Sequence, residues 1–149
     1  MNFLNKFKKI QKPLIIAEIG NNHEGSFKNA IKLIDAAKKA GVDAVKFQTF
    51  KTELYYSNQD PDRIKKLKKF QLSFYQFRKL AKHAKKKNLL FISTPFDLKS
   101  LDFLKKIVDI IKISSGDNNF YDLIKKVAKL NKELIISTGG ADLKQIVKI

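Results

Sequence analysis

The sequence has 149 residues, enough for one domain with a substantial core, and 44% of them are hydrophobic, which is typical of a globular protein rather than a disordered one. It contains no apolar run of 18 residues, so we expect no association with a membrane, and its lack of cysteine excludes disulfides and thiolate metal sites. Residues 1–13 carry four lysines and no continuous apolar segment, so we expect no signal peptide and a cytoplasmic location.

The formal net charge of +17 raises the question of a polyanionic partner. The basic residues are nearly all lysines, and Arg63 and Arg78 are the two arginines, although arginine is the usual reader of bases. The lysines recur in short groups along predicted helices: Lys38–Lys39, Lys85–Lys87, Lys105–Lys106 and Lys125–Lys126. We interpret them as solvated helix faces and predict no nucleic-acid partner. An acidic partner is the less favoured alternative, and the positive field would in either case attract anionic substrates.

Five apolar runs rich in Ile, Val and Phe predict β-strands at residues 14–19, 44–49, 89–94, 109–114 and 133–137. Few polar residues interrupt these runs, which is typical of strands that are buried on both faces of a parallel sheet.

Helical patterns separate most of these strands. Ser26 is a predicted N-cap for a helix that stops at Gly41, and Ser73 is a predicted N-cap for a second helix. Shorter helices are predicted at Leu98–Ile107 and Phe120–Leu130, a helical turn is predicted at about 62–70 within the polar connection 51–72, and the sequence ends within a predicted fifth helix.

The alternation of strands and helices predicts an α/β protein with a parallel sheet. A doubly wound sheet and a (β/α)₈ barrel both fit this alternation, but no GxGxxG motif follows the first strand. Polar residues instead follow each strand, as the active-site face of a TIM barrel requires. We therefore predict that residues 1–149 form the N-terminal portion of a TIM barrel, with about the first five strands, and that the later strands lie outside this sequence.

Two lysines occupy positions inside predicted strands. Lys46 and Gln48 share one face of their strand, while Val45 and Phe47 share the other, and Lys112 lies among isoleucines. Burying an ammonium group is costly unless an anion meets it. One interpretation is a salt bridge, for instance with Glu18. The other is that both lysines meet a bound phosphate or carboxylate, and the hydroxyl groups at the neighbouring strand ends favour it: Thr94, Ser114, Ser115, Ser137 and Thr138.

The first strand raises a similar question, because Glu18 interrupts an apolar run that is followed by the polar stretch "GNNHEG". Glu18 is either a core carboxylate with a partner or part of a site. His23 and Glu24 are equally compatible with an ordinary loop, because a lone histidine is more often not a ligand. No close group of His, Asp and Glu provides a complete metal site in the sequence.

Five motifs, in this order and spacing, resemble those of the sialic acid synthase family, which includes the legionaminic acid and related nonulosonic acid synthases. They are "AEIGNNHEG", "DAVKFQTF", "FISTPFD", "IKISSGD" and "IISTGG", and the resemblance runs from about Pro13 to Ile149. It implies a TIM-barrel enzyme that condenses phosphoenolpyruvate with an open-chain N-acylated hexosamine, such as N-acetylmannosamine, and releases phosphate.

The resemblance also implies site residues. Lys46, Thr94, Lys112, Ser115 and Ser137 would bind phosphoenolpyruvate. Glu18 and Gln48 would bind the sugar, and Glu18 and Asp117 are the candidate catalytic residues. Many family members have Glu at the position of Asp117, whose side chain is one methylene shorter.

Further parts of the enzyme are implied but lie outside this sequence. The family uses a divalent metal, Mn²⁺ or Mg²⁺, whose histidine ligands belong to later strands, and it has a small C-terminal domain that resembles antifreeze protein. We expect the full-length enzyme to be a homodimer in the synthesis of surface-polysaccharide precursors. Two alternatives stay open: a related phosphoenolpyruvate aldol-type synthase of another ulosonic acid, and an inactive fragment that acts as a basic binding module. In an incomplete barrel, strands 14–19 and 133–137 would be edges.

Overall fold

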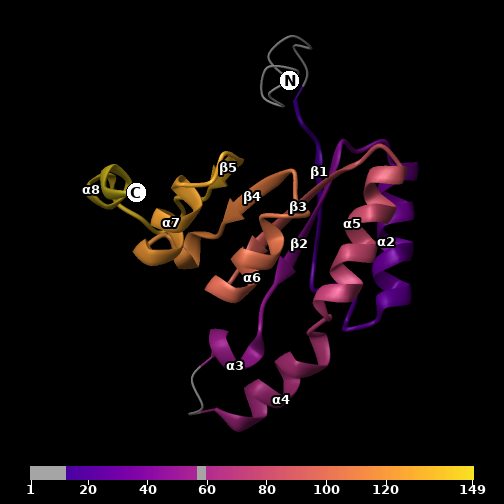
Figure 1. Ribbon diagram of the computed structural model, residues 1–149, viewed down its shortest axis with the longest axis horizontal. Helices are drawn as coiled ribbons and strands as arrows, with labels where there is room; N and C mark the ends of the chain where they lie inside the picture. The colour runs from indigo at the N-terminus through magenta and orange to yellow at the C-terminus, as the bar shows by residue number, and fades with distance from the viewer. Residues whose placement is uncertain (1–12, 57–59) are drawn as a thin grey trace.

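The computed structural model describes residues 13–56 and 60–149, and the prediction of five parallel strands is confirmed. The strands are β1 (Ile16–Gly20), β2 (Ala44–Thr49), β3 (Leu90–Pro95), β4 (Ile110–Ile113) and β5 (Glu133–Ile136). They form one sheet in the order β1-β2-β3-β4-β5, and each pairs in parallel with the next (Figure 1). Consecutive order with helical crossovers is the arrangement of a TIM barrel, and it differs from that of a doubly wound sheet, in which the order reverses.

The helices lie at the predicted segments, and α6 and α7 are shorter than predicted. They are α2 (Phe27–Lys39), α4 (Pro61–Phe70), α5 (Phe74–Lys86), α6 (Leu98–Leu104), α7 (Tyr121–Ala128) and α8 (Leu143–Lys148). Two short elements were not predicted: α3 (Thr52–Tyr55) and the 3₁₀ turn η1 (Ser115–Asp117). Lys51 precedes α3 and is not a capping residue type, whereas Ser114 precedes η1 but its hydroxyl donates a hydrogen bond to the Asp117 side chain and caps no backbone amide.

The predicted N-caps form the expected hydrogen bonds. The Ser26 hydroxyl accepts a hydrogen bond from the Asn29 amide at 3.2 Å, and Ser73 forms a reciprocal capping box with Gln76. Gly41 follows the end of α2 with φ +78°, a conformation that favours glycine, as its role as a stop signal requires. These local signals set the starting points of α2 and α5, which pack side by side against the sheet (Figure 1).

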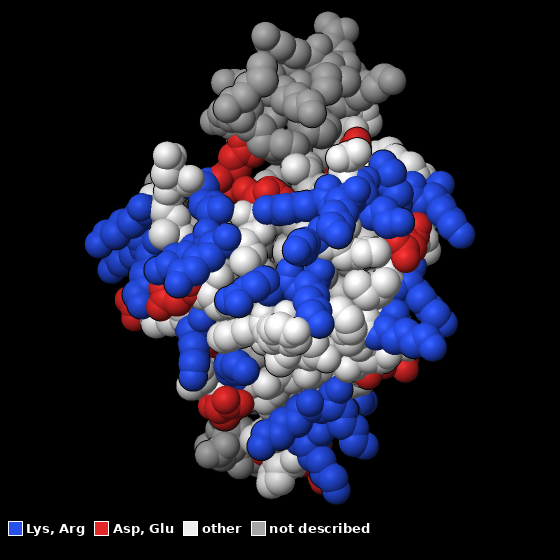
Figure 2. Space-filling model, turned by 45° about the vertical axis from the view of Figure 1, so that its right-hand side comes forward, with Lys and Arg blue, Asp and Glu red and all other residues white. Residues whose placement is uncertain are grey.

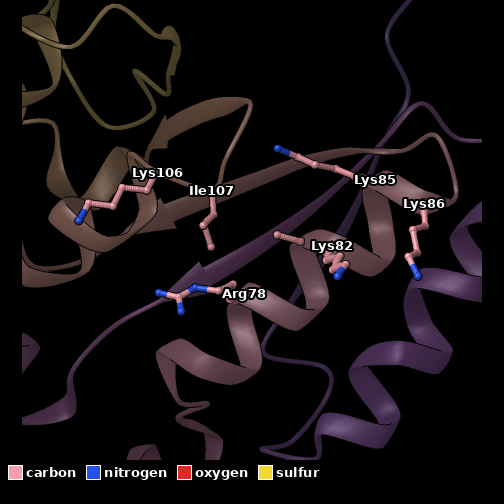
Figure 3. A pocket seen from close by; sticks show the side chains of 7 residues that line it. Arg78, Lys82, Lys85, Lys86, Lys106 and Ile107 are labelled. Carbon is pink, nitrogen blue, oxygen red and sulfur yellow. The ribbon is translucent and has the colours of Figure 1, made fainter.

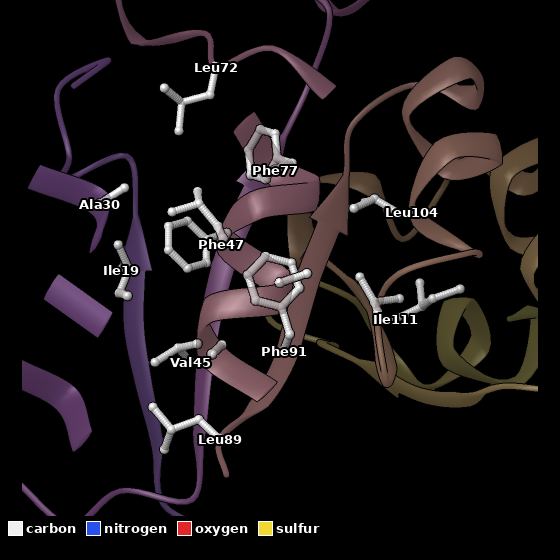
Figure 4. Packing of buried hydrophobic residues seen from close by; sticks show 14 of the residues in the cluster. Ile19, Ala30, Val45, Phe47, Leu72, Phe77, Leu89, Phe91, Leu104 and Ile111 are labelled. Atoms are coloured by element: carbon white, nitrogen blue, oxygen red, sulfur yellow. The ribbon is translucent and has the colours of Figure 1, made fainter. Parts of the chain in front are cut away.

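One face of the sheet carries the main hydrophobic core. Phe47 lies at its centre, with ring centroids 5.4 Å from Phe91 on the neighbouring strand and 6.2 Å from Phe77 on α5 (Figure 4). Val45, Ile111 and Ile113 belong to the same cluster, as do the buried residues of α2 and α5. Residues of odd number on β2, β3 and β4 therefore face the helices.

The opposite face, which a complete barrel would enclose, is apolar only near the start of the strands. Ala44, Ile92 and Ile110 form a small buried group there, and partly buried apolar residues of β1, β3 and β5 pack against them. Two residues further along β2 and β4, the same face carries Lys46 and Lys112. The alternation of side chains thus separates an apolar layer from a polar layer that lies toward the carboxyl ends of the strands.

A buried aspartate organises the loops beyond these carboxyl ends. Asp97 is 3% exposed and accepts hydrogen bonds from the backbone of Lys51 at 2.8 Å and from the backbone and hydroxyl of Ser100, each at 2.7 Å. One carboxylate therefore caps α6 and also fixes the segment that leads from β2 into α3.

Strands β1 and β5 are the outer strands of the sheet in the described part of the chain, as predicted. No helix among the described residues is long and apolar enough to cross a membrane.

The close approach of Gly25 to α4 gives a test of the loop after β1. A Cβ at Gly25 would lie 1.8 Å from the backbone oxygen of Lys69, whereas a Cβ at Gly41, which has the same φ of +78°, would meet nothing within 4 Å. We expect Gly41→Ala to lower the free energy of unfolding by about 1–2 kcal/mol through backbone strain alone, and Gly25→Ala to lower it by more than about 3 kcal/mol. Urea denaturation of both variants measures the difference, and equal losses would show that this contact does not hold the loop.

Candidate active site

The polar layer brings most of the predicted site residues to one face of the sheet. Glu18 pairs in register with Lys46, and Gln48 pairs in register with Thr94 on the next strand. Since side chains of paired residues in parallel strands point to the same face, these four lie together on the face opposite the main core. Lys112 shares that face through the register of Ile110 with Ile92.

The Lys46 ammonium forms an ion pair with the Glu18 carboxylate across β1 and β2. The Lys46 side chain is 16% exposed and that of Glu18 is 51% exposed. The salt bridge that the sequence suggested for a strand lysine is therefore confirmed for Lys46. It also explains why β1 tolerates Glu18, which lies on an outer strand with its side chain half in solvent.

Lys112 is in a different environment. Its ammonium donates hydrogen bonds to the Ile113 carbonyl and to the Ser137 hydroxyl, and neither acceptor carries a charge. Burial lowers the pKa of Lys112, the nearby Lys46 charge lowers it further, and Glu18 and Asp117 raise it. Two ammonium groups that repel each other over a face lined with hydroxyls form a site that an anion would stabilise.

Asp117 and Ser115 lie in η1, directly after β4. The Asp117 carboxylate accepts a hydrogen bond from the Ser114 hydroxyl, which fixes the carboxylate close to the strand end. Ser115 is exposed and lies beside the loop after β5, because a Cβ at Gly139 would be 3.5 Å from the Cβ of Ser115. The predicted residues of β4 and β5 therefore meet at one corner of the polar layer.

The loop after β1 also reaches this layer. The Asn21 side-chain amide donates a hydrogen bond to the Gln48 side-chain oxygen at 2.9 Å, and the Asn21 oxygen is buried with no hydrogen-bond partner. Gly20, with φ +52°, lets the backbone turn here, and a Cβ at this position would lie 3.2 Å from a Glu18 carboxylate oxygen. The hydrogen bond from Asn21 therefore holds Gln48 in place, and the sequence motif did not indicate this contact.

His23 lies in the loop between β1 and α2, in agreement with the interpretation as a loop residue, but its side chain is buried. It is 1% exposed and stacks on Phe47 at a centroid distance of 6.1 Å. Its Nδ1 accepts a hydrogen bond from the Gly25 amide at 3.0 Å, and its Nε2 has no hydrogen-bond partner among the described residues. His23 therefore anchors the loop between β1 and α2 on the helix side of the sheet, and it does not belong to the polar layer.

Among the described residues, no group of three or more His, Cys, Asp and Glu side chains is arranged to hold a metal ion. The residues present thus do not provide a ligand set for the divalent metal that the resemblance implies.

A separate cleft of about 450 Å³ lies on the outer surface between α5 and the end of α6 (Figure 3). It is lined by Arg78, Ala81, Lys82, Lys85, Lys86, Lys106 and Ile107. Lys85 forms an ion pair with Asp109 at 3.0 Å, and the lysines of the last turn of α5 lie where the helix dipole favours cations. Figure 2 shows lysine and arginine side chains spread over several parts of the surface. We therefore assign the lining lysines a structural role.

A parallel sheet in consecutive order, with lysines, hydroxyls and carboxylates at the carboxyl ends of its strands, defines an α/β protein of the TIM-barrel type. The chain belongs to the NeuB family, whose sequence profile matches residues 33–149.

Relatives with named activities support this membership. The chain is 41% identical to an N,N'-diacetyllegionaminic acid synthase of Campylobacter jejuni, over 92% of this chain and 45% of that protein. It is 35% identical to an N-acetylneuraminate-9-phosphate synthase of Drosophila melanogaster, over 100% of this chain and 44% of that one. The crystal structure of an N-acetylneuraminic acid synthetase from Leptospira borgpetersenii, in complex with citrate, superposes with a TM-score of 0.86 and 34% identity, over 91% and 47% of the two chains. The chain thus spans less than half the length of these relatives.

Burial lowers the pKa of His23 below its ordinary value of 6.5, which predicts a pH dependence of stability. Below that value the unfolded chain binds a proton that the folded chain does not, so the free energy of unfolding falls by up to about 1.4 kcal/mol per pH unit until the folded pKa is reached. We expect His23→Gln to reduce this slope relative to the wild type, measured by urea denaturation between about pH 7.5 and pH 5.5. An unchanged slope in His23→Gln would contradict the assignment.

Proposed function

We propose that this chain is the N-terminal half of a TIM-barrel synthase that joins phosphoenolpyruvate to an N-acylated hexosamine and releases phosphate. The observation that carries the proposal is the pair of lysines on one face of the sheet, Lys46 and Lys112. The hydrogen-bond acceptors of Lys112 in the described part of the chain are both neutral. Membership of the NeuB family supports it, because relatives are named as synthases of legionaminic, pseudaminic and neuraminic acids.

Phosphoenolpyruvate carries a phosphate and a carboxylate, so its binding requires several cations and hydrogen-bond donors. Lys46 and Lys112 would supply the charge, and the hydroxyls of Thr94, Ser115 and Ser137 would complete the site. The Leptospira relative was crystallised with citrate, which is also a small polyanion. Binding of phosphoenolpyruvate would relieve the repulsion between the two ammonium groups and fix the position of its enol carbon.

The acceptor sugar would lie beside β1 and β2. Glu18 and Gln48 are on adjacent strands, and both have oxygen atoms that accept hydrogen bonds from hydroxyl groups. Asn21 fixes the orientation of the Gln48 amide, so the Gln48 nitrogen atom would donate to the sugar. This arrangement would place the sugar aldehyde next to the enol carbon.

The reaction then has three steps. The C3 atom of phosphoenolpyruvate forms a bond to the aldehyde carbon of the sugar, and the aldehyde oxygen takes up a proton. Water adds to the resulting cation at C2 and loses a proton, which leaves a hydroxyl on C2. The C2–O bond to phosphate then breaks, the hydroxyl proton passes to the departing phosphate, and a keto acid and inorganic phosphate remain. Asp117 and Glu18, two carboxylates toward the carboxyl ends of the strands, would transfer these protons. Since the described residues lack a metal-ligand set, we assign no step to a metal ion.

The proposal is tested by phosphate release from the complete enzyme in the presence of phosphoenolpyruvate and N-acetylmannosamine. We expect Lys112→Ala to raise the KM for phosphoenolpyruvate by at least about thirtyfold, because a charged partner is removed from a partly buried site, with little change in the KM for the sugar. Lys132→Ala is the matched control, since Lys132 also donates to a backbone carbonyl, that of Val108 at 2.8 Å, but at the opposite end of the strands. Failure of the wild-type enzyme to release phosphate with any N-acylated hexosamine would overturn the proposal.

A further inference from the structure

Four aromatic residues form a cluster beyond the carboxyl ends of β2 and β3. The ring of Tyr55, in α3, lies 4.5 Å from the ring of Phe96, 4.5 Å from that of Tyr56 and 6.0 Å from that of Phe50, measured between centroids. Arg63 of α4 covers the Tyr56 ring at 4.6 Å and donates a hydrogen bond to its hydroxyl at 3.1 Å. Three aromatic neighbours thus hold Tyr55 in place, and Arg63 holds one of them, Tyr56.

This cluster lies above the polar layer. Phe50 follows Gln48 by two positions, and Phe96 follows Thr94 by two positions, so the alternation of the strands carries both rings toward the face of the two lysines. The Phe96 amide donates a hydrogen bond to the Thr49 carbonyl at 3.1 Å, which shows that the parallel pairing continues to this point. Tyr55 packs on both phenylalanines from outside the strands.

The sheet order places Tyr55 between the proposed sugar site and Asp117. Its contacts with Phe50 and Phe96 put the ring over the ends of β2 and β3, and η1, which carries Asp117, follows β4, the next strand of the sheet. Burial raises the pKa of the Tyr55 phenol, and the neighbouring Tyr56 and the Asp117 carboxylate raise it further. The phenol therefore stays protonated across the physiological pH range.

A purely structural role does not account for every feature of this ring. Phe50 is 3% exposed and belongs to the packed interior, whereas Tyr55 is only partly buried. A partly buried aromatic ring that is held beside polar groups is typical of ligand sites, which combine apolar walls with a few polar groups.

We propose that Tyr55 forms the wall of a subsite that binds the apolar N-acyl group of the acceptor sugar, an inference that rests on the function proposed above. The acyl methyl group would pack on the exposed side of the Tyr55 ring while the sugar hydroxyls meet Glu18 and Gln48. Tyr55 is then a specificity-determining residue, and it takes no part in the bond changes.

The test compares three variants of the complete enzyme by phosphate release. Tyr55→Leu removes the ring, Tyr55→Phe keeps the ring and removes the hydroxyl, and Tyr75→Leu is the control, because Tyr75 is 64% exposed on α5. We expect Tyr55→Leu to raise the KM for N-acetylmannosamine about three- to tenfold, with the KM for phosphoenolpyruvate changed less than about twofold. Tyr55→Phe and Tyr75→Leu should stay within about twofold of the wild type for both substrates.

The outcomes separate this inference from the proposed function. An unchanged sugar KM in Tyr55→Leu, or an equal rise in both KM values, would overturn the subsite while phosphate release by the wild type upholds the synthase. Absence of phosphate release by the wild type would overturn both. If Tyr55→Leu does not fold, the wild type decides the matter: the acyl methyl protons of N-acetylmannosamine should show a nuclear Overhauser effect to the Tyr55 ring, and its absence at saturating sugar would overturn the subsite.

Discussion

The mutual repulsion of two ammonium groups on one face of a parallel sheet is the constraint on which the proposed anion site depends. Lys46 has its charge compensated by Glu18, but Lys112 is held by a carbonyl and a hydroxyl, and burial and Lys46 both lower its pKa. Lysine is an unusual residue inside a parallel strand, because burying a charge is costly unless an anion meets it. The proposed function supplies that anion as phosphoenolpyruvate.

The rest of the fold holds that face in place. The aromatic core around Phe47 fixes the opposite side of the sheet, so the alternation of side chains leaves Lys46 and Gln48 on the polar face. The loops are fixed by single contacts: Gly25 against the backbone of Lys69, and Asp97 between α6 and the segment after β2. Both contacts join segments that are far apart in the sequence, and they fix the loops at the carboxyl ends of the strands.

The strands were predictable because nearly continuous apolar runs rich in Ile, Val and Phe indicate a buried parallel sheet, and β2 was predicted with its observed bounds. The helix starts at Ser26 and Ser73 were predictable because a side-chain cap is a local signal. For the candidate site, the residues that share one face of a strand were predictable, because side chains alternate between the two faces. The burial of His23, the contact of Asn21 with Gln48 and the position of Tyr55 depend on how loops fold over neighbouring strands, and no local pattern records that.

A crystal structure of the protein with phosphoenolpyruvate would show whether the two lysines bind this anion. We expect its phosphate and carboxylate groups to lie between the Lys46 and Lys112 ammonium groups, within hydrogen-bond distance of Ser137. Phosphoenolpyruvate bound instead in the lysine-lined cleft between α5 and α6, or no binding on the lysine face at saturating concentration, would contradict it.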